Sequence, residues 1–138
     1  MSRLVRRLIG VPAVAVLVMA GTTAVASAAE GKPSGAPPEG SMGVWCVSTP
    51  GAKACFAEYG DRVWVKDTKA NGQSAAGTIK DNEPSASWHR ECFNRRGADG
   101  GWVMCNFDVP EHHNGVLWAV NNPFIGSQSN TKIFTTII

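Results

Sequence analysis

Ser87, His89 and Glu91 place a hydroxyl, an imidazole and a carboxylate close together in the chain, and these are the groups of a hydrolytic triad. On an extended strand, alternate residues share one face, so the three side chains would point the same way. Successive same-face residues stand about 7 Å apart, which is too far for a hydrogen-bonded relay without a bend. We therefore interpret this stretch as the polar outer face of a strand and expect no enzymatic activity.

Two other stretches contain residue types that bind metals. Asp67–Gly72 resembles the opening of a calcium loop, but Lys69 occupies the third place and Thr78 the twelfth, where oxygen donors belong. Glu111–His113, with His89 elsewhere, gathers imidazoles, yet adjacent residues of an extended chain point to opposite sides. We interpret the first as an Asn-Gly turn and the second as a solvated loop, and we expect neither a metal nor a cofactor.

The chain has four cysteines, Cys46, Cys55, Cys92 and Cys105. A reversal at Pro50-Gly51 would place Cys46 opposite Cys55. A looser reversal at Ala98-Asp99 would place Cys92 opposite Cys105. Opposed residues of antiparallel strands bring their Cα atoms to about 4.5–5.5 Å, within disulfide range. We therefore favour these two bridges over the two crossed pairings, and over a zinc site, since the chain has no C-x-x-C pair.

The first 28 residues have the order of a cleavable secretory signal. Met1–Arg7 carries three arginines, Leu8–Ala20 is apolar, and small residues follow up to Ala26-Ser27-Ala28. The apolar run would span only about 20 Å as a helix, against about 30 Å of hydrocarbon in a bilayer. We predict a signal peptide over 1–28, secretion to the extracellular space and no permanent membrane anchor.

Removal of the signal changes the charge and exposes a polar leader. It takes away three of the thirteen basic side chains and none of the eleven acidic ones, so the net charge moves from +2 to −1. A nearly neutral domain lacks the basic surface that nucleic-acid binding requires. Residues 29–43 are rich in Pro and Gly and are predicted to be a flexible leader. Residues 44–138 are predicted to be one folded, monomeric domain.

From Val44 onward, short β-branched and aromatic runs alternate with turn residues, which predicts an all-β domain. We expect a small antiparallel β-sandwich or barrel stabilised by two disulfides. The predicted strands are 44–48, 54–59, 62–67, 74–80, 86–93, 102–107, 115–120 and 131–138. The last is apolar on both faces, so we expect it to be central in its sheet or covered twice.

The hairpin around Gly60 suggests a binding face. Gly60 suits the first position of a two-residue type II′ turn, which would pair Phe56 with Val65. Within this hairpin Val63 and Val65 would face one side and Trp64 the other. The predicted binding residues on the side of Trp64 are Tyr59, Arg62, Trp64 and Lys66. Aromatic rings on such a face stack against sugar rings, although the first use of the five tryptophans is core burial.

Three stretches carry a family resemblance. They run from Cys55 to Ala75 (CFAEYGDRVWVKDTKANGQSA), from Glu91 to Asn94 (ECFN) and from Cys105 to Asp108 (CNFD). The chain resembles small secreted actinobacterial proteins of uncharacterised function over roughly residues 46–111. The resemblance implies secretion and a β-rich disulfide domain, and it carries over no catalytic residue.

These observations lead to a functional expectation. We predict a secreted, noncatalytic binding module for a cell-wall glycan, a matrix or another extracellular protein. The alternative is an inhibitor of extracellular peptidases, which would present a disulfide-pinned loop such as Thr49–Lys53 or Arg95–Gly101. A small secreted hydrolase is the third hypothesis and would require a cleft with convergent polar groups.

Overall fold

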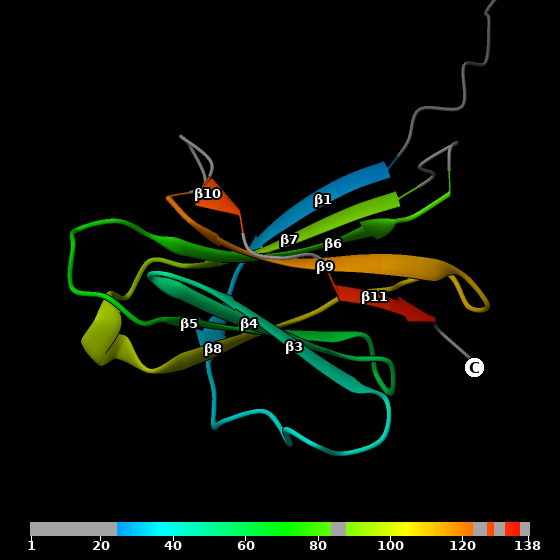
Figure 1. The fold of residues 1–138 in the computed structure, drawn as a ribbon, viewed down its shortest axis with the longest axis horizontal. Coiled ribbons are helices and arrows are strands. Elements are labelled where there is room, and N and C mark those ends of the chain that lie inside the picture. Colours follow the sequence, from blue (N-terminus) through cyan, green and yellow to red (C-terminus); the bar gives the residue numbers. More distant parts are fainter. Residues whose placement is uncertain (1–24, 84–87, 123–126, 129–131, 136–138) are drawn as a thin grey trace, which may run out of the picture.

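The computed structural model describes residues 25–83, 88–122, 127–128 and 132–135. They form two β-sheets stacked face to face, with one short 3-10 turn, η1 (Ala98–Gly100) (Figure 1). The six-stranded sheet contains β1 (Val25–Glu30), β6 (Ala75–Asp81), β7 (Trp88–Asn94), β9 (Asn114–Asn121), β10 (Ser127–Gln128) and β11 (Lys132–Thr135). The five-stranded sheet contains β2 (Lys32–Pro33), β3 (Val44–Thr49), β4 (Ala52–Ala57), β5 (Arg62–Asp67) and β8 (Trp102–Asn106). The predicted all-β class is confirmed, and the sheets form an open sandwich and not a closed barrel.

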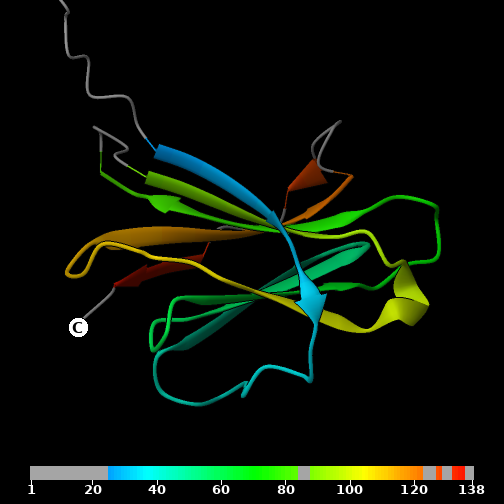
Figure 2. The same ribbon diagram turned by 180° about the vertical axis from the view of Figure 1, so that it is seen from behind.

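Strand order follows from antiparallel pairing of consecutive strands and from crossings between the sheets. The five-stranded sheet has the order β2-β8-β5-β4-β3, and the other has β1-β7-β6-β9-β10, with β11 also paired to β9. Most described pairs are antiparallel, but β1 runs parallel to β7. The chain crosses between the sheets after β1, after β5, after β7 and after β8 (Figures 1 and 2). Each crossing brings loops from both sheets to the ends of the sandwich.

The core lies between the sheets, and alternation along β5 shows how the sequence directs it. Val63 and Val65 are fully buried and face the six-stranded sheet, as predicted. Opposite them the backbone at Gly77 comes so close that a Cβ there would lie 2.8 Å from Val65 Cγ2. Glycine is therefore needed at this point of β6, because any side chain would push the sheets apart. Phe56 completes this layer and stacks on Trp45 with ring centroids 6.2 Å apart.

Both predicted disulfides are present, although one has a different setting from the expected one. Cys46 and Cys55 oppose each other on β3 and β4, with their Cα atoms 4.1 Å apart. Cys92 and Cys105 are also bridged, at 5.8 Å, but β7 and β8 belong to different sheets. The expected β7–β8 hairpin was wrong, because the glycine-rich loop carries the chain from one sheet to the other. The second bridge therefore joins the two sheets through the core.

The β4–β5 hairpin is present with a register two residues away from the predicted one. Phe56 pairs with Val63, and not with Val65. The loop has four residues, Glu58–Asp61, and is closed by a hydrogen bond from the Asp61 N–H to the Glu58 carbonyl at 3.3 Å. A shift of two residues preserves the face of every side chain, so the inside and outside of β5 were still assigned correctly.

The segment expected to be a flexible leader is part of the fold. Residues 29–33 contribute to β1 and β2, and residues 34–43 cross the outer face of the five-stranded sheet (Figure 2). The predicted cleavage point after Ala28 falls inside β1, while residues 1–24 of the predicted signal lie outside the described residues. No helix in the described part of the chain is long and apolar enough to cross a membrane.

The C-terminal strand occupies a different place from the expected one. Its described part, Lys132–Thr135, pairs with β9 in antiparallel register. Among the described residues it has no second strand partner, so it lies at the edge of its sheet and not at the centre. The short β10 pairs with the other end of β9, from Val120 to Asn121. Two short strands thus lie beside β9, where one long central strand was expected.

Candidate functional site

The four predicted binding residues do not form one exposed patch. Arg62, Trp64 and Lys66 lie along the outer face of β5, as alternation predicts. Tyr59 is 61% exposed in the preceding loop, whereas Trp64 is only 6% exposed. The ring that was expected to stack against a ligand is therefore covered in this structure.

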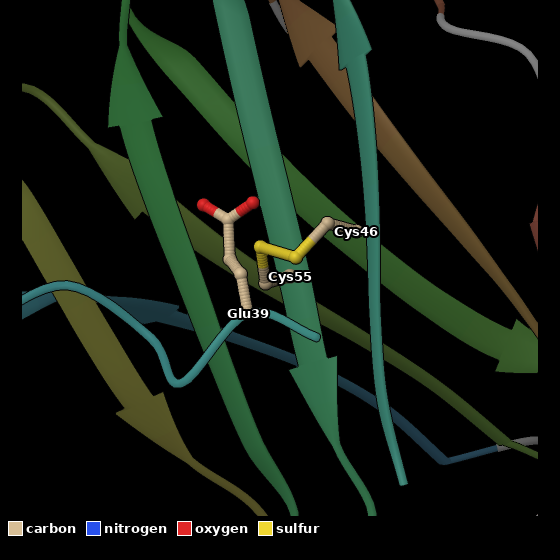
Figure 3. A group of neighbouring side chains, drawn as sticks. All are labelled: Glu39, Cys46 and Cys55. Carbon is tan, nitrogen blue, oxygen red and sulfur yellow. A yellow bond between two sulfur atoms is a disulfide. The ribbon is translucent and has the colours of Figure 1, made fainter. Parts of the chain in front are cut away.

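Trp64 is covered by residues 34–43, which form a strap across the sheet. Its indole Nε1 donates a hydrogen bond to Ser34 Oγ at 3.1 Å. Further along, the buried Pro37 lies on the sheet and Glu39 forms an ion pair with Lys53 at 2.7 Å. Figure 3 shows the Glu39 side chain beside the Cys46–Cys55 disulfide, whose sulfurs are bonded to each other and so provide no thiolate for a metal. The strap thus buries Trp64 and, through Glu39, also holds Lys53 in the adjoining part of the face.

The adjoining part of the face is a row of three half-buried residues on neighbouring strands. Lys53 of β4 pairs with Lys66 of β5, and Lys66 pairs with Trp102 of β8. Both lysine Nζ atoms lie 6.0 Å from the centroid of the Trp102 ring, within the range of a cation–π contact. The indole of Trp102 is half-buried, so part of its surface is open to solvent. We call these three residues the Trp102 face.

The backbone holds the Trp102 face in place from both sides. The Trp102 carbonyl accepts a hydrogen bond from the Ser34 N–H at 3.0 Å, while the strand pairs with β5 on its other side. Gly101, with φ at 71°, lets the chain enter β8 directly from the preceding turn. An aromatic platform of this kind loses little conformational entropy when it binds, because its strand is already ordered.

The fold separates His89, which lies on β7, from His112 and His113, which precede β9. Ser87 lies outside the described residues, and His89 and Glu91 remain on β7. His112 is exposed with φ at 58°, while His113 lies 3.5 Å from the carboxylate of Asp81. The two neighbouring histidines thus take different environments.

The calcium-like stretch is a loop closed by its own side chains. Asp67 Oδ1 accepts a hydrogen bond from the Lys69 N–H at 3.0 Å, and Asn71 Oδ1 accepts one from the Gln73 N–H at 3.0 Å. Gly72 has φ at 71°, in agreement with an Asn-Gly turn. Thr78 is a buried residue of β6. The loop oxygens therefore serve the turn itself.

Asp61 lies in the β4–β5 loop, and the pKa of its carboxyl group is perturbed. Its Oδ2 accepts a hydrogen bond from the Val109 N–H at 3.1 Å, and its φ is 49°. Partial burial raises the pKa of Asp61; the Val109 hydrogen bond opposes this change and the charge of Asp108 adds to it. A raised folded-state pKa contributes stability at pH values below the unfolded pKa, and that contribution is lost as the pH rises through the folded pKa.

We therefore expect Asp61→Asn to raise the melting temperature at pH 7, because asparagine keeps an acceptor, tolerates positive φ and carries no charge. The gain should disappear near pH 3, where the carboxyl of the parent protein is protonated. Thermal melts of both proteins at the two pH values check this expectation. A gain that is the same at both pH values would mean that charge is not its cause.

Sequence reasoning missed the Trp102 face because its residues come from strands far apart in the chain. Lys53 and Lys66 follow from the β4–β5 hairpin, but the pairing of β5 with β8 joins residues separated by a complete crossing to the other sheet. The available signal was the alternation of Trp102 with Val103, which marks Trp102 as outward-facing.

Together the fold and this face define a disulfide-stapled β-sandwich with an aromatic and cationic outer surface on one sheet. The chain matches no protein-family model, and it has no significant similarity to a curated protein or to a solved structure.

Proposed function

We propose that this protein is a secreted, noncatalytic binding domain that holds an extracellular glycan against the Trp102 face. The observation that carries the proposal is the half-exposed indole of Trp102 with two lysine ammonium groups 6.0 Å from its ring. The apolar C–H face of a sugar ring packs on an indole, and a lysine beside the ring donates hydrogen bonds to sugar oxygens. Lys66 is the lysine for this role, because the ammonium group of Lys53 is paired with Glu39.

The framework supports an extracellular role. Disulfides form and persist in oxidising compartments, and this small domain has two of them. They staple the β3–β4 hairpin and join the two sheets, so the strands below the Trp102 face are firmly held. A rigid surface of this kind favours binding over catalysis, since its platform needs no closing movement to meet a ligand.

The proposal predicts that Trp102→Ala weakens retention on glycans by about tenfold, as expected when an aromatic contact worth about 1.5 kcal/mol is lost. The measurement is a pull-down of the purified protein on insoluble cell-wall polysaccharide, followed by a titration with soluble fragments.

The matched control is Trp118→Ala. Trp118 is also half-buried, lies on the outer face of the other sheet, and has Lys80 Nζ 5.0 Å from its ring. Loss of a comparable aromatic–lysine contact there should leave glycan retention unchanged. The proposal fails if the parent protein binds no glycan, or if the two variants lose retention equally.

Peptidase inhibition is a second candidate, and one observation favours it. The loop Arg95–Gly101 is exposed at Arg95 and Arg96, and its base is tied to the inter-sheet bridge through Cys92. The other loop considered, Thr49–Lys53, is a tight turn with Gly51 and Ala52 buried, so it offers no protruding segment. Inhibition assays with peptidases that cleave after arginine test this candidate, and Arg95→Ala and Arg96→Ala locate the contact.

A further inference from the structure

One end of the sandwich contains a cavity of about 280 Å³ between two loops from different sheets. Residues 69–74, which join β5 to β6, form one wall, and residues 95–98, which follow β7, form the other. Asp67 lies at its base. The cavity is separate from the Trp102 face but adjoins it in the chain, because its lining residue Asp67 follows Lys66.

Hydrogen bonds fix both walls of the cavity. In the first wall, Gln73 Oε1 accepts a hydrogen bond from Asn121 Nδ2 at 3.1 Å. In the second, Asn94 Oδ1 accepts one from the Arg96 N–H at 3.1 Å. Because Asn94 is fully buried and Asn121 belongs to β9, each loop is tied to the body of the domain. The cavity is therefore preformed.

The charges that line the cavity are mostly positive. Lys69, Arg95 and Arg96 are exposed around it, against a single acidic lining residue, Asp67. Asp67 is 2% exposed and has one oxygen occupied by the Lys69 N–H. Arg95 is paired with Glu30, so the local excess of positive charge comes from Lys69 and Arg96. Neither of these two side chains has a hydrogen-bond or ion-pair partner among the residues that the structure describes.

Besides these two cationic side chains, the cavity is lined by two backbone amides that can donate hydrogen bonds to a ligand. Gly72 and Gly97 both line the cavity with positive φ, at 71° and 75°, and no atom lies within 4 Å of where a Cβ would stand. Their N–H groups donate to no acceptor in the described part of the chain. Free amides in left-handed turns next to cationic side chains are the donors with which proteins hold carboxylates and phosphates.

We infer that this cavity binds the carboxylate or phosphate group of an acidic glycan, with Lys69 and Arg96 as the cations and the amides of Gly72 and Gly97 as further donors. The inference rests on the proposed glycan function and narrows its ligand class to acidic polymers. One acidic sugar would occupy the cavity while a neighbouring ring of the same polymer lies on the Trp102 face. Binding then depends on ionic strength, because exposed cations are screened by salt.

Three sugars that differ in one group test the inference on the purified, isotope-labelled protein. Glucuronate, glucose 6-phosphate and glucose are titrated while the amide chemical shifts are followed. The acidic sugars should shift the amides of Gly72 and Gly97, and glucose should not. A response to glucuronate alone assigns the site to carboxylates, and a response to glucose 6-phosphate alone assigns it to phosphates.

The test variant is Lys69→Gln/Arg96→Gln, and the control is Lys32→Gln/Arg62→Gln, which removes the same charge from exposed positions outside the cavity. The first should weaken binding of the acidic sugar by about tenfold or more, and the second by less than twofold. Equal weakening in both, or no shift at Gly72 and Gly97 with either acidic sugar, would overturn the inference.

The same titration separates this inference from the proposed function. Trp102→Ala should leave the shifts of Gly72 and Gly97 with single acidic sugars unchanged, because one sugar in the cavity does not reach the platform. If those shifts persist while Trp102→Ala has no effect on polymer retention, the Trp102 face fails and the cavity stands. If polymer retention needs Trp102 but the amides do not respond to acidic sugars, the cavity fails and the face stands.

Discussion

Replacing Cys92 and Cys105 together by alanine is expected to lower the free energy of unfolding by about 3 kcal/mol from loop closure alone. The two residues are 13 positions apart, so opening the bridge releases a medium-sized loop in the unfolded chain. The bridge also belongs to the main core, where Cys92 is 0% and Cys105 5% exposed, and alanine leaves a void there. Urea denaturation followed by tryptophan fluorescence measures the loss.

The matched comparison is the double replacement of Cys46 and Cys55, which are 9 positions apart. Loop closure predicts a cost within about 0.5 kcal/mol of the first. However, this bridge joins paired strands on the outer face, and Cys46 is only half-buried. Removal of the Cys92–Cys105 bridge should therefore cause the larger loss in the free energy of unfolding. An equal or smaller loss would show that this bridge stabilises the fold only by restricting the unfolded chain.

The local parts of this fold could be predicted from the sequence because their signals lie within a few residues of one another. Pro50-Gly51 marks the β3–β4 turn, and Cys46 indeed pairs with Cys55. Alternation along β5 placed Val63 inside and Trp64 outside. Such periodicity reports the face of a strand directly, but it does not report what covers that face.

Apart from the register of the β4–β5 hairpin, the failures concern contacts between distant parts of the chain. The turn between Cys92 and Cys105 has the composition of a hairpin loop, yet it leads to the other sheet. The predicted pairing of Cys92 with Cys105 was right, but for a different reason. The two residues face each other from opposed sheets, and they are not opposed within one hairpin. Nothing in the local sequence distinguishes these arrangements.

The strap shows the same limit for the candidate site. Residues 34–43 are too poor in large apolar side chains to form a core, and composition therefore predicted a flexible leader. A segment without a core of its own still packs well on an existing sheet, and Ser34 provides the acceptor that the buried indole of Trp64 needs. The partly exposed tryptophan of this face is thus Trp102, which only the pairing of β5 with β8 brings beside Lys66.

Asn94 connects the framework to the cavity through three hydrogen bonds of its side chain. Its Nδ2 donates to the Val65 carbonyl at 3.1 Å and to the Gly101 carbonyl at 3.0 Å, while its Oδ1 accepts from the Arg96 N–H. These bonds link β7 to β5 and to the start of β8 across the sandwich. The side chain is fully buried, so water cannot replace a lost partner.

Asn94→Asp is nearly isosteric, yet it turns the amide donor into an oxygen that faces two carbonyl oxygens. We expect a loss of about 3–5 kcal/mol in the free energy of unfolding at pH 7, since a buried charge is left without a partner. The loss should shrink near pH 4, because a protonated carboxyl is neutral and again donates a hydrogen bond.

The control is Asn106→Asp at an exposed position of β8, which should change stability by less than about 0.5 kcal/mol. Urea denaturation at both pH values measures the difference, and equal effects of the two substitutions would contradict it. The Asn94 side chain also fixes the loop that carries Arg96. Under conditions in which Asn94→Asp still folds, we therefore expect this variant to bind acidic sugars more weakly in the cavity.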